Sequence, residues 1–149
     1  MSNHNIIALD PGTNGGIALY EEAHGNVGVD PMPEGMTGIV DYLREISAHH
    51  PNLTAVVEKV GGYMPGNSGP AACKFARHCG NLEATLYALR VPIIDVTPNV
   101  WMKGLGSFPK DKKDRKNAIK ELMSRTYPHL KVSLKTSDAL GVLTWYLGK

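Results

Sequence analysis

Short apolar runs bounded by polar or glycine-rich residues alternate along the chain with longer stretches that are apolar on one helical face. The runs NIIAL and GIALY enclose a turn rich in proline and glycine, which is typical of a hairpin, and the runs TAVV and VPIIDV predict buried strands. Thr37, Pro70 and either Thr136 or Ser137 are suited to begin helices. The predicted strands are 5–9, 16–20, 27–29, 54–57 and 91–96, and the predicted helices are 37–49, 70–89, 112–127 and 136–147.

The order of these elements predicts an α/β fold. Three consecutive strands predict an antiparallel meander, and the later strand–helix–strand units predict right-handed crossovers. The expected result is a mixed five-stranded sheet in which strands 1–3 are antiparallel, strands 4 and 5 run parallel to strand 1, and helices cover both faces. Segment 97–109 predicts a loop with about one helical turn, and Gly80 is expected to interrupt the 70–89 helix. With no repeat and no linker, residues 1–149 are expected to form one domain.

The composition narrows the class of protein. The chain has 149 residues, of which 42% are hydrophobic and 20% charged, and this excludes wholesale disorder. No apolar run is long enough to span a bilayer, and no basic segment precedes a long apolar one, so we expect a soluble, cytoplasmic protein without a membrane partner. Cys73 and Cys79 are too few for a disulfide framework and are wrongly spaced for a zinc or redox pair. They are predicted to be reduced thiols on or near a helix.

The net charge of +2 conceals a division between the two parts of the chain. Residues 1–60 contain eight acids and two bases, whereas residues 61–149 contain fourteen bases and six acids. Segment 103–120 alone has seven bases and two acids. Such clustering is expected of a protein that binds a polyanion, and equally of a solvated helix face, so the charge pattern alone leaves both interpretations open.

Three acids stand where strands or helices begin or end. Asp10 follows the first predicted strand, Glu58 follows the fourth, and Asp138 opens the last helix. Taken singly, each has an ordinary explanation as a turn residue, a solvated strand end or a helix-dipole residue. If strands one and four are parallel neighbours, however, the three carboxylates converge at one sheet edge and repel each other unless cations join them. Mg²⁺ or Mn²⁺ would suit such ligands, and two ions about 3.5–4 Å apart would suit phosphodiester hydrolysis.

Four motifs in this order resemble the RuvC family of Holliday junction resolvases. They are IALDPGTNGGIALYE, VVEKV followed by a Gly-rich loop, VPIIDVTPNVWMKGLGS, and SDALGVLTW. The resemblance extends over nearly the whole chain and is strongest to phage-encoded members. It implies the RNase H-like fold of the retroviral-integrase type, which agrees with the sheet predicted above. It also implies a homodimer that resolves four-way and other branched DNA junctions by paired nicking, with divalent metal ions.

The resemblance assigns roles to particular residues. Asp10 would bind both of two Mg²⁺ or Mn²⁺ ions, Glu58 one of them and Asp138 the other. The family usually has an acid or a histidine three residues before the last aspartate, whereas this chain has Lys135. An ammonium group cannot bind a metal ion, so Lys135 would either stabilise negative charge in the transition state, as a catalytic residue, or contact a DNA phosphate.

Other residues are predicted to contact DNA. Gly12 and Thr13 would bring the backbone close to the scissile strand, although a plain hairpin turn uses the same residues. The DPGTNGG segment also resembles the phosphate loop of actin-like ATPases, but those need two such domains, so no nucleotide cofactor is expected. Tyr63 and Met64 would stack on bases at the junction centre, or else have no role in their loop. The predicted phosphate contacts are Lys103, Lys110, Lys113, Arg115 and Lys116.

The resemblance also places the dimer interface on the 70–89 helix, where a two-fold axis would match that of a four-way junction. Trp101 and Trp145 are expected to pack in the core.

The leading hypothesis is a divalent-metal-dependent junction endonuclease. The alternatives are a flap or nonspecific nickase of the same fold, and a catalytically weak protein that binds branched DNA.

Overall fold

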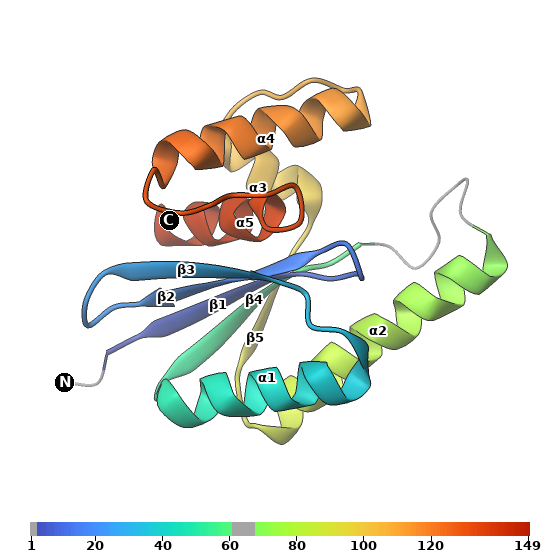
Figure 1. Cartoon of the computed structure of the whole chain (residues 1–149), viewed down its shortest axis with the longest axis vertical. Coiled ribbons are helices and arrows are strands. Elements are labelled where there is room, and N and C mark those ends of the chain that lie inside the picture. Colours follow the sequence, from blue (N-terminus) through green and yellow to red (C-terminus); the bar gives the residue numbers. More distant parts are fainter. Residues whose placement is uncertain (1–2, 61–67) are drawn as a thin grey trace.

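The computed structural model describes residues 3–60 and 68–149, which form a five-stranded sheet between two layers of helices (Figure 1). The strand order is β3-β2-β1-β4-β5. Strands β1, β2 and β3 pair antiparallel, and β4 and β5 run parallel to β1. The predicted mixed sheet is thus confirmed. The strands are β1 (Asn5–Asp10), β2 (Gly16–Glu21), β3 (Asn26–Pro31), β4 (Leu53–Glu58) and β5 (Ile93–Val96).

Helices cover both faces of the sheet, as predicted, and the described residues contain five of them. Helix α5 lies against β1, β2 and β4, and α3 and α4 pack on the outside of α5. Helices α1 and α2 pack on the opposite face and against each other (Figure 1). The helices are α1 (Gly35–His49), α2 (Gly69–Ala88), α3 (Pro98–Leu105), α4 (Lys112–Thr126) and α5 (Ser137–Leu147).

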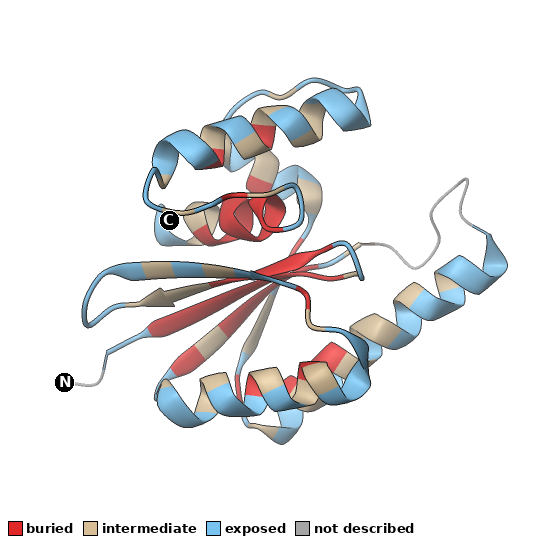
Figure 2. Cartoon of the chain, viewed as in Figure 1, coloured by how far each residue is buried: buried red, intermediate tan, exposed pale blue. Residues whose placement is uncertain are grey.

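Side-chain alternation along the central strands divides the buried residues into two cores. In β1, Ile6 and Ala8 face α5, whereas Ile7 and Leu9 face α1 and α2. This alternation is what the period of two in a strand dictates. Figure 2 shows the consequence: the central strands are buried on both faces, and the inner sides of α5, α1 and α2 are buried against them.

Two sequence predictions about helices are wrong. Segment 97–109 contains the eight-residue helix α3, because Pro98 suits its first turn and Trp101 anchors it in the core. Gly80 does not interrupt α2, which is continuous from Gly69 to Ala88. The surroundings of Gly80 are open, and a glycine on an exposed helix face costs only about 1 kcal/mol relative to alanine.

Two predicted helix caps are also different in the structure. Helix α1 begins before Thr37, after Glu34, whose side chain makes no capping hydrogen bond. Thr136 precedes α5, but its hydroxyl bonds with the Ser133 backbone and side chain instead of capping the helix.

The prediction about the two thiols agrees with the structure. Cys73 is exposed and Cys79 is half-buried on α2, and both are free thiols. Within the described part of the chain, none of the helices combines the length and hydropathy that a membrane crossing requires.

Candidate active site

Two carboxylates meet at one edge of the sheet because of strand register. Strands β1 and β4 are parallel neighbours in which Leu9 pairs with Val57, so Asp10 and Glu58 occupy the next positions of the two strands. By the alternation that directs Ala8 and Val56 toward α5, Asp10 and Glu58 also lie on the α5 face. Both residues are buried, with 7% and 8% of their surfaces exposed. The sheet therefore delivers two acids to one buried place at its carboxyl edge.

The third carboxylate comes from the first turn of α5. Asp138 is buried, with 7% of its surface exposed. The segment leading into α5 lies directly on Gly16, which pairs with Asp10 across β1 and β2. A Cβ at Gly16 would overlap the backbone of Lys135 and Thr136, so only glycine permits this close approach. The absence of a side chain at Gly16 thus allows Asp138 to lie near the two strand acids.

Two further side chains hold the carboxylates. The indole Nε1 of Trp101 donates a hydrogen bond of 2.6 Å to Oε2 of Glu58. The ammonium of Lys116 lies 3.2 Å from Oδ2 of Asp138. The other oxygen of Asp138, Oδ1, is buried and has no hydrogen-bond partner among the described residues. An unpaired buried carboxylate oxygen is costly, so the site has capacity for a further cation or donor.

The pKa values of the strand acids show that the positive charge near the three carboxylates does not balance their negative charge. Burial raises the pKa of Asp10 well above its usual range, and the negative charges of Glu58 and Asp138 raise it further, against the opposing effect of Lys116. Burial also raises the pKa of Glu58, although the hydrogen bond from Trp101 opposes this shift. A hydrogen bond between the two carboxyl groups raises the pKa of Asp10 and lowers that of Glu58.

The donor set suits a hard divalent cation. Carboxylate oxygens are the ligands that Mg²⁺ and Mn²⁺ prefer, and a cation at this place would compete with protonation of Asp10. Across residues 3–60 and 68–149, however, the side chains do not form a ready-made cluster of three or more metal-ligating groups. Lys116 already occupies one oxygen of Asp138, and Trp101 one oxygen of Glu58.

Lys116 lies at the carboxylate site and not among the exposed lysines where the sequence analysis placed it. It was expected among the phosphate contacts, but its ammonium is at the carboxylate site, whereas the side chain of Lys135 is exposed. A signal for this was present in the sequence. Lys116 precedes the buried Ile119 by three residues and Met123 by seven, so the three side chains lie on the inward face of α4. Trp101 was expected to pack in the core, and it does so while also binding Glu58.

The predicted DNA contacts are divided among several elements. Lys103 on α3, Lys110 and Lys113 are exposed. Arg115 is half-buried and donates a hydrogen bond of 2.9 Å to the backbone carbonyl of Lys110, which gives it a structural role in the turn before α4. Gly12 and Thr13 form the loop directly after Asp10, where Gly12 has a positive φ of 120°. Tyr63 and Met64 lie outside the described residues.

Comparisons with known proteins agree with this architecture. No protein-family model matches the chain, and no curated protein sequence matches it. Among solved structures, RuvC of Thermus thermophilus is similar, with 17% sequence identity and a TM-score of 0.56 over 97% of this chain and 95% of that chain. The chain has the RuvC fold. The structure of T. thermophilus RuvC in complex with a Holliday junction substrate is similar over the same shares, with 16% identity and a TM-score of 0.55. The likeness to RuvC thus includes the sheet and both helical layers.

The raised pKa of Asp10 predicts that this residue destabilises the metal-free protein at neutral pH. A carboxyl group whose pKa rises on folding lowers stability as the pH increases from about 3.9, its unfolded value, through its folded value. We expect Asp10→Asn to be more stable than the wild type at pH 8 in a chelator, by about 2–4 °C in thermal midpoint for each kcal/mol of repulsion relieved. The gain should shrink toward pH 4. The control is Asp41→Asn, an exposed residue on α1, and an equal gain there would contradict the interpretation.

Proposed function

We propose that this protein is a divalent-metal-dependent endonuclease that nicks branched DNA, with a four-way junction as its preferred substrate. The observation that carries the proposal is that three buried carboxylates, Asp10, Glu58 and Asp138, interact electrostatically beside the carboxyl edge of a sheet with the RuvC fold, although they do not form a ready-made ligand cluster within residues 3–60 and 68–149. A solved structure of that fold contains a Holliday junction substrate. Carboxylates without enough compensating charge are what a metal-dependent phosphodiesterase requires before its ions bind.

The carboxylates would hold Mg²⁺ or Mn²⁺, as two ions per active site. Two observations support this assignment, because added positive charge would relieve both: Oδ1 of Asp138 has no hydrogen-bond partner within residues 3–60 and 68–149, and the pKa values of Asp10 and Glu58 are raised. Bound ions would supply an activated water and would stabilise negative charge on the phosphodiester. The residues of this chain orient the ligands: the Trp101 indole fixes Glu58, and Gly16 allows the approach of Asp138.

The basic side chains beside the site support binding to nucleic acid. Lys103, Lys110 and Lys113 are exposed on α3, on the turn before α4 and on α4. These elements pack outside α5, whose first turn carries Asp138. We propose that the three lysines contact phosphates on either side of the scissile bond, where each phosphate neutralised adds salt-dependent affinity. Gly12 and Thr13 would approach the same strand from the loop after Asp10.

The exposed face of α2 is the proposed dimer interface. Positions 73, 76, 80 and 87 lie on one side of this helix, and Cys73, Ala76, Gly80 and Tyr87 are all exposed. Tyr87 is 68% exposed, which is a large apolar surface to leave in water. A two-fold axis through this face would pair two active sites, as two symmetric nicks in a junction require.

A cleavage assay on matched substrates tests the proposed function. We expect the wild type to nick a four-way junction at two symmetric positions in Mg²⁺ or Mn²⁺, and to cut a linear duplex and a flap much more slowly. Asp10→Asn should bind the junction as well as the wild type or better, because a negative charge near phosphate is removed, and should not cut it. Equal cutting of flap or duplex would favour the nickase alternative, and binding without cutting in either metal would favour the alternative of a branched-DNA-binding protein.

The position of Lys116 predicts that it, and not Lys135, is the catalytic cation. Lys116→Ala should lower the single-turnover rate at saturating DNA by a factor on the order of 10²–10³, as for the loss of one charged group that stabilises the transition state. Lys135→Ala should weaken binding and leave that rate within about threefold of wild type, as should Lys113→Ala, an exposed neighbour on α4. A large loss of saturating rate in Lys135→Ala alone would reverse the assignment.

Gly80 offers a direct test of the dimer. Apart from its chain neighbours and the nearby backbone of α2, a Cβ at this position meets no described heavy atom within 4 Å, so Gly80→Arg should leave the protomer folded while placing a charge in the proposed interface. We expect the wild type to sediment as a dimer and Gly80→Arg as a monomer with an unchanged circular dichroism spectrum. The control variant Ala48→Arg adds the same charge at an exposed position of α1, outside the proposed interface, and should remain dimeric. Sedimentation of the wild type as a monomer at all concentrations would remove the interface.

A further inference from the structure

A concave site lies beside the loop that follows Asp10. It is a cavity of about 390 Å³ between the N-terminal end of α1 and the middle of α2. Thr13 belongs to its lining and stands three residues after Asp10. The same loop packs on α2, because a Cβ at Gly12 would lie 3.6 Å from the ring of Phe75. The cavity is therefore adjacent in the chain and in space to the residues that would approach a scissile strand.

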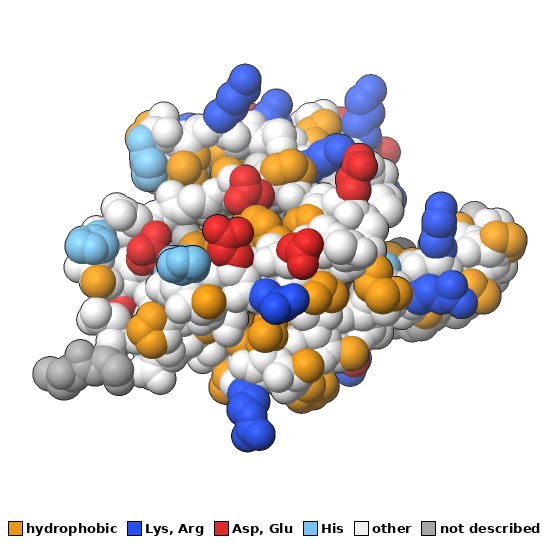
Figure 3. All heavy atoms as spheres, turned by 60° about the horizontal axis from the view of Figure 1, so that its bottom comes forward, with side chains coloured by type: hydrophobic (Ala, Val, Ile, Leu, Met, Phe, Trp, Pro, Cys, Tyr) orange, Lys and Arg blue, Asp and Glu red, His pale blue; other side chains and the backbone are white. Residues whose placement is uncertain are grey.

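The cavity is apolar on one side and cationic at its rim. Met32 and Ile39 are buried in its floor beside Pro33. Lys74 and Arg77 line it from α2, and both are exposed. In the described ranges 3–60 and 68–149, no ion pair joins either of these two side chains to an acid. Figure 3 shows Lys and Arg side chains beside hydrophobic ones on the projecting part of α2.

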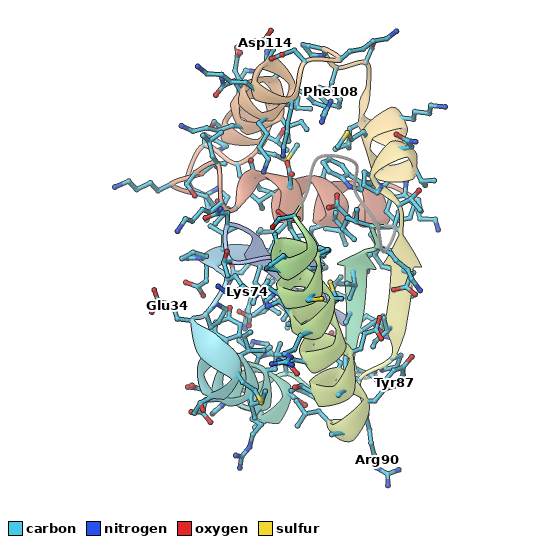
Figure 4. All side chains as sticks on the ribbon, turned by 90° about the vertical axis from the view of Figure 1, so that its right-hand side faces the viewer. Glu34, Lys74, Tyr87, Arg90, Phe108 and Asp114 are labelled. Atoms are coloured by element: carbon cyan, nitrogen blue, oxygen red, sulfur yellow. The ribbon has the colours of Figure 1, made fainter. Side chains whose placement is uncertain are left out.

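The lining also contains groups that select among ligands. Glu34 stands at the rim, and Figure 4 shows Lys74 on the side of α2 that faces it. Asn81 adds an amide, and His78 has a buried Nε2 that finds no hydrogen-bond partner in the part of the chain that the structure describes. Burial lowers the pKa of His78, so the neutral ring has one nitrogen that donates and one that accepts. The carboxylate of Glu34 accepts hydrogen bonds, and the amide of Asn81 both donates and accepts them, as recognition of the edge of a nucleobase requires.

We propose that this cavity binds one unpaired nucleotide of the DNA strand, with its phosphate at Lys74 and Arg77 and its base on the Met32, Pro33 and Ile39 floor. The assignment of this nucleotide to a DNA strand rests on the proposed function, whereas binding of a nucleotide in the cavity does not depend on it. Its volume lies at the lower end of the range for small-molecule sites, which fits one nucleotide and not a duplex. A strand whose base leaves the stack beside the cut is the substrate that branched DNA offers at its branch point.

The cavity remains available in the proposed dimer. Helix α2 has three faces: Leu82 and Leu86 are buried in the core, Gly80 lies on the proposed interface, and His78 and Asn81 line the cavity. Positions 74, 77, 78 and 81 recur at three and four residues, so they share one side of the helix that differs from the side of positions 73, 76, 80 and 87.

The binding of two small probes to the full chain tests the proposal. Amide signals are followed by NMR during titration with deoxyadenosine 5′-monophosphate and with 2-deoxyribose 5-phosphate, which lacks the base, at constant ionic strength. We expect the nucleotide to bind in the millimolar range with shifts at Thr13, His78 and Asn81, and at least about fivefold more tightly than the sugar phosphate, because the base gains stacking and apolar contact. Equal affinity for the two probes, or shifts confined to α4, would overturn the proposal.

Matched variants and a competition experiment complete the test. Arg77→Gln should weaken nucleotide binding by about tenfold, and Arg90→Gln, at the opposite end of α2 from Lys74 in Figure 4, should leave it within about twofold. A single strand of about 12 nucleotides should displace the mononucleotide, and failure to displace it would overturn the assignment to a DNA strand. If the strand displaces the nucleotide but no junction is cut, the nucleotide site stands and the proposed nuclease activity falls.

Discussion

The burial of three carboxylates beside one sheet edge, where Lys116 is the one described lysine paired with them, is the constraint on which the rest of this structure depends. Asp10, Glu58 and Asp138 are each at most 8% exposed, so their mutual repulsion is only weakly screened by water. Lys116 and Trp101 relieve part of it by binding Asp138 and Glu58. The remainder is visible in the raised pKa of Asp10. A fold that tolerates such a cost is prepared for a ligand that brings positive charge, which is the basis of the proposed metal site.

Close contacts between glycine and larger groups hold this arrangement in place. Gly141 on α5 leaves no room for a Cβ against the ring of Trp101, so α3 and α5 approach closely enough for the indole to reach Glu58. Gly104 on α3 contacts Trp145 of α5 in the same way. Core packing is dense and resists added atoms, so these glycines fix the distance between the two helices. The position of Glu58 thus depends on residues with no chemistry of their own.

Helix α2 contributes to three different parts of the molecule. One side of it belongs to the core, one side is exposed with small residues and Tyr87, and one side lines the cavity near Thr13. The length and amphipathic pattern of α2 were evident in the sequence, but its continuity through Gly80 was not. Glycine lowers helix propensity locally, and packing along the rest of α2 outweighs that cost.

The sequence by itself determined the sheet, because apolar runs and their turns specify strands locally and the order of elements restricts the topology. It also indicated Asp10, Glu58 and Asp138, since each stands at the end of an element whose direction the topology sets. Only the tertiary structure decided that Lys116 meets Asp138, that Trp101 binds Glu58, and that α2 and α1 enclose a cavity. Lys116 and Asp138 are 22 positions apart in the sequence, Trp101 and Glu58 are 43 apart, and the residues of α1 and α2 that line the cavity are more than 30 apart. Such contacts depend on the packing angles between helices, which no local sequence pattern encodes.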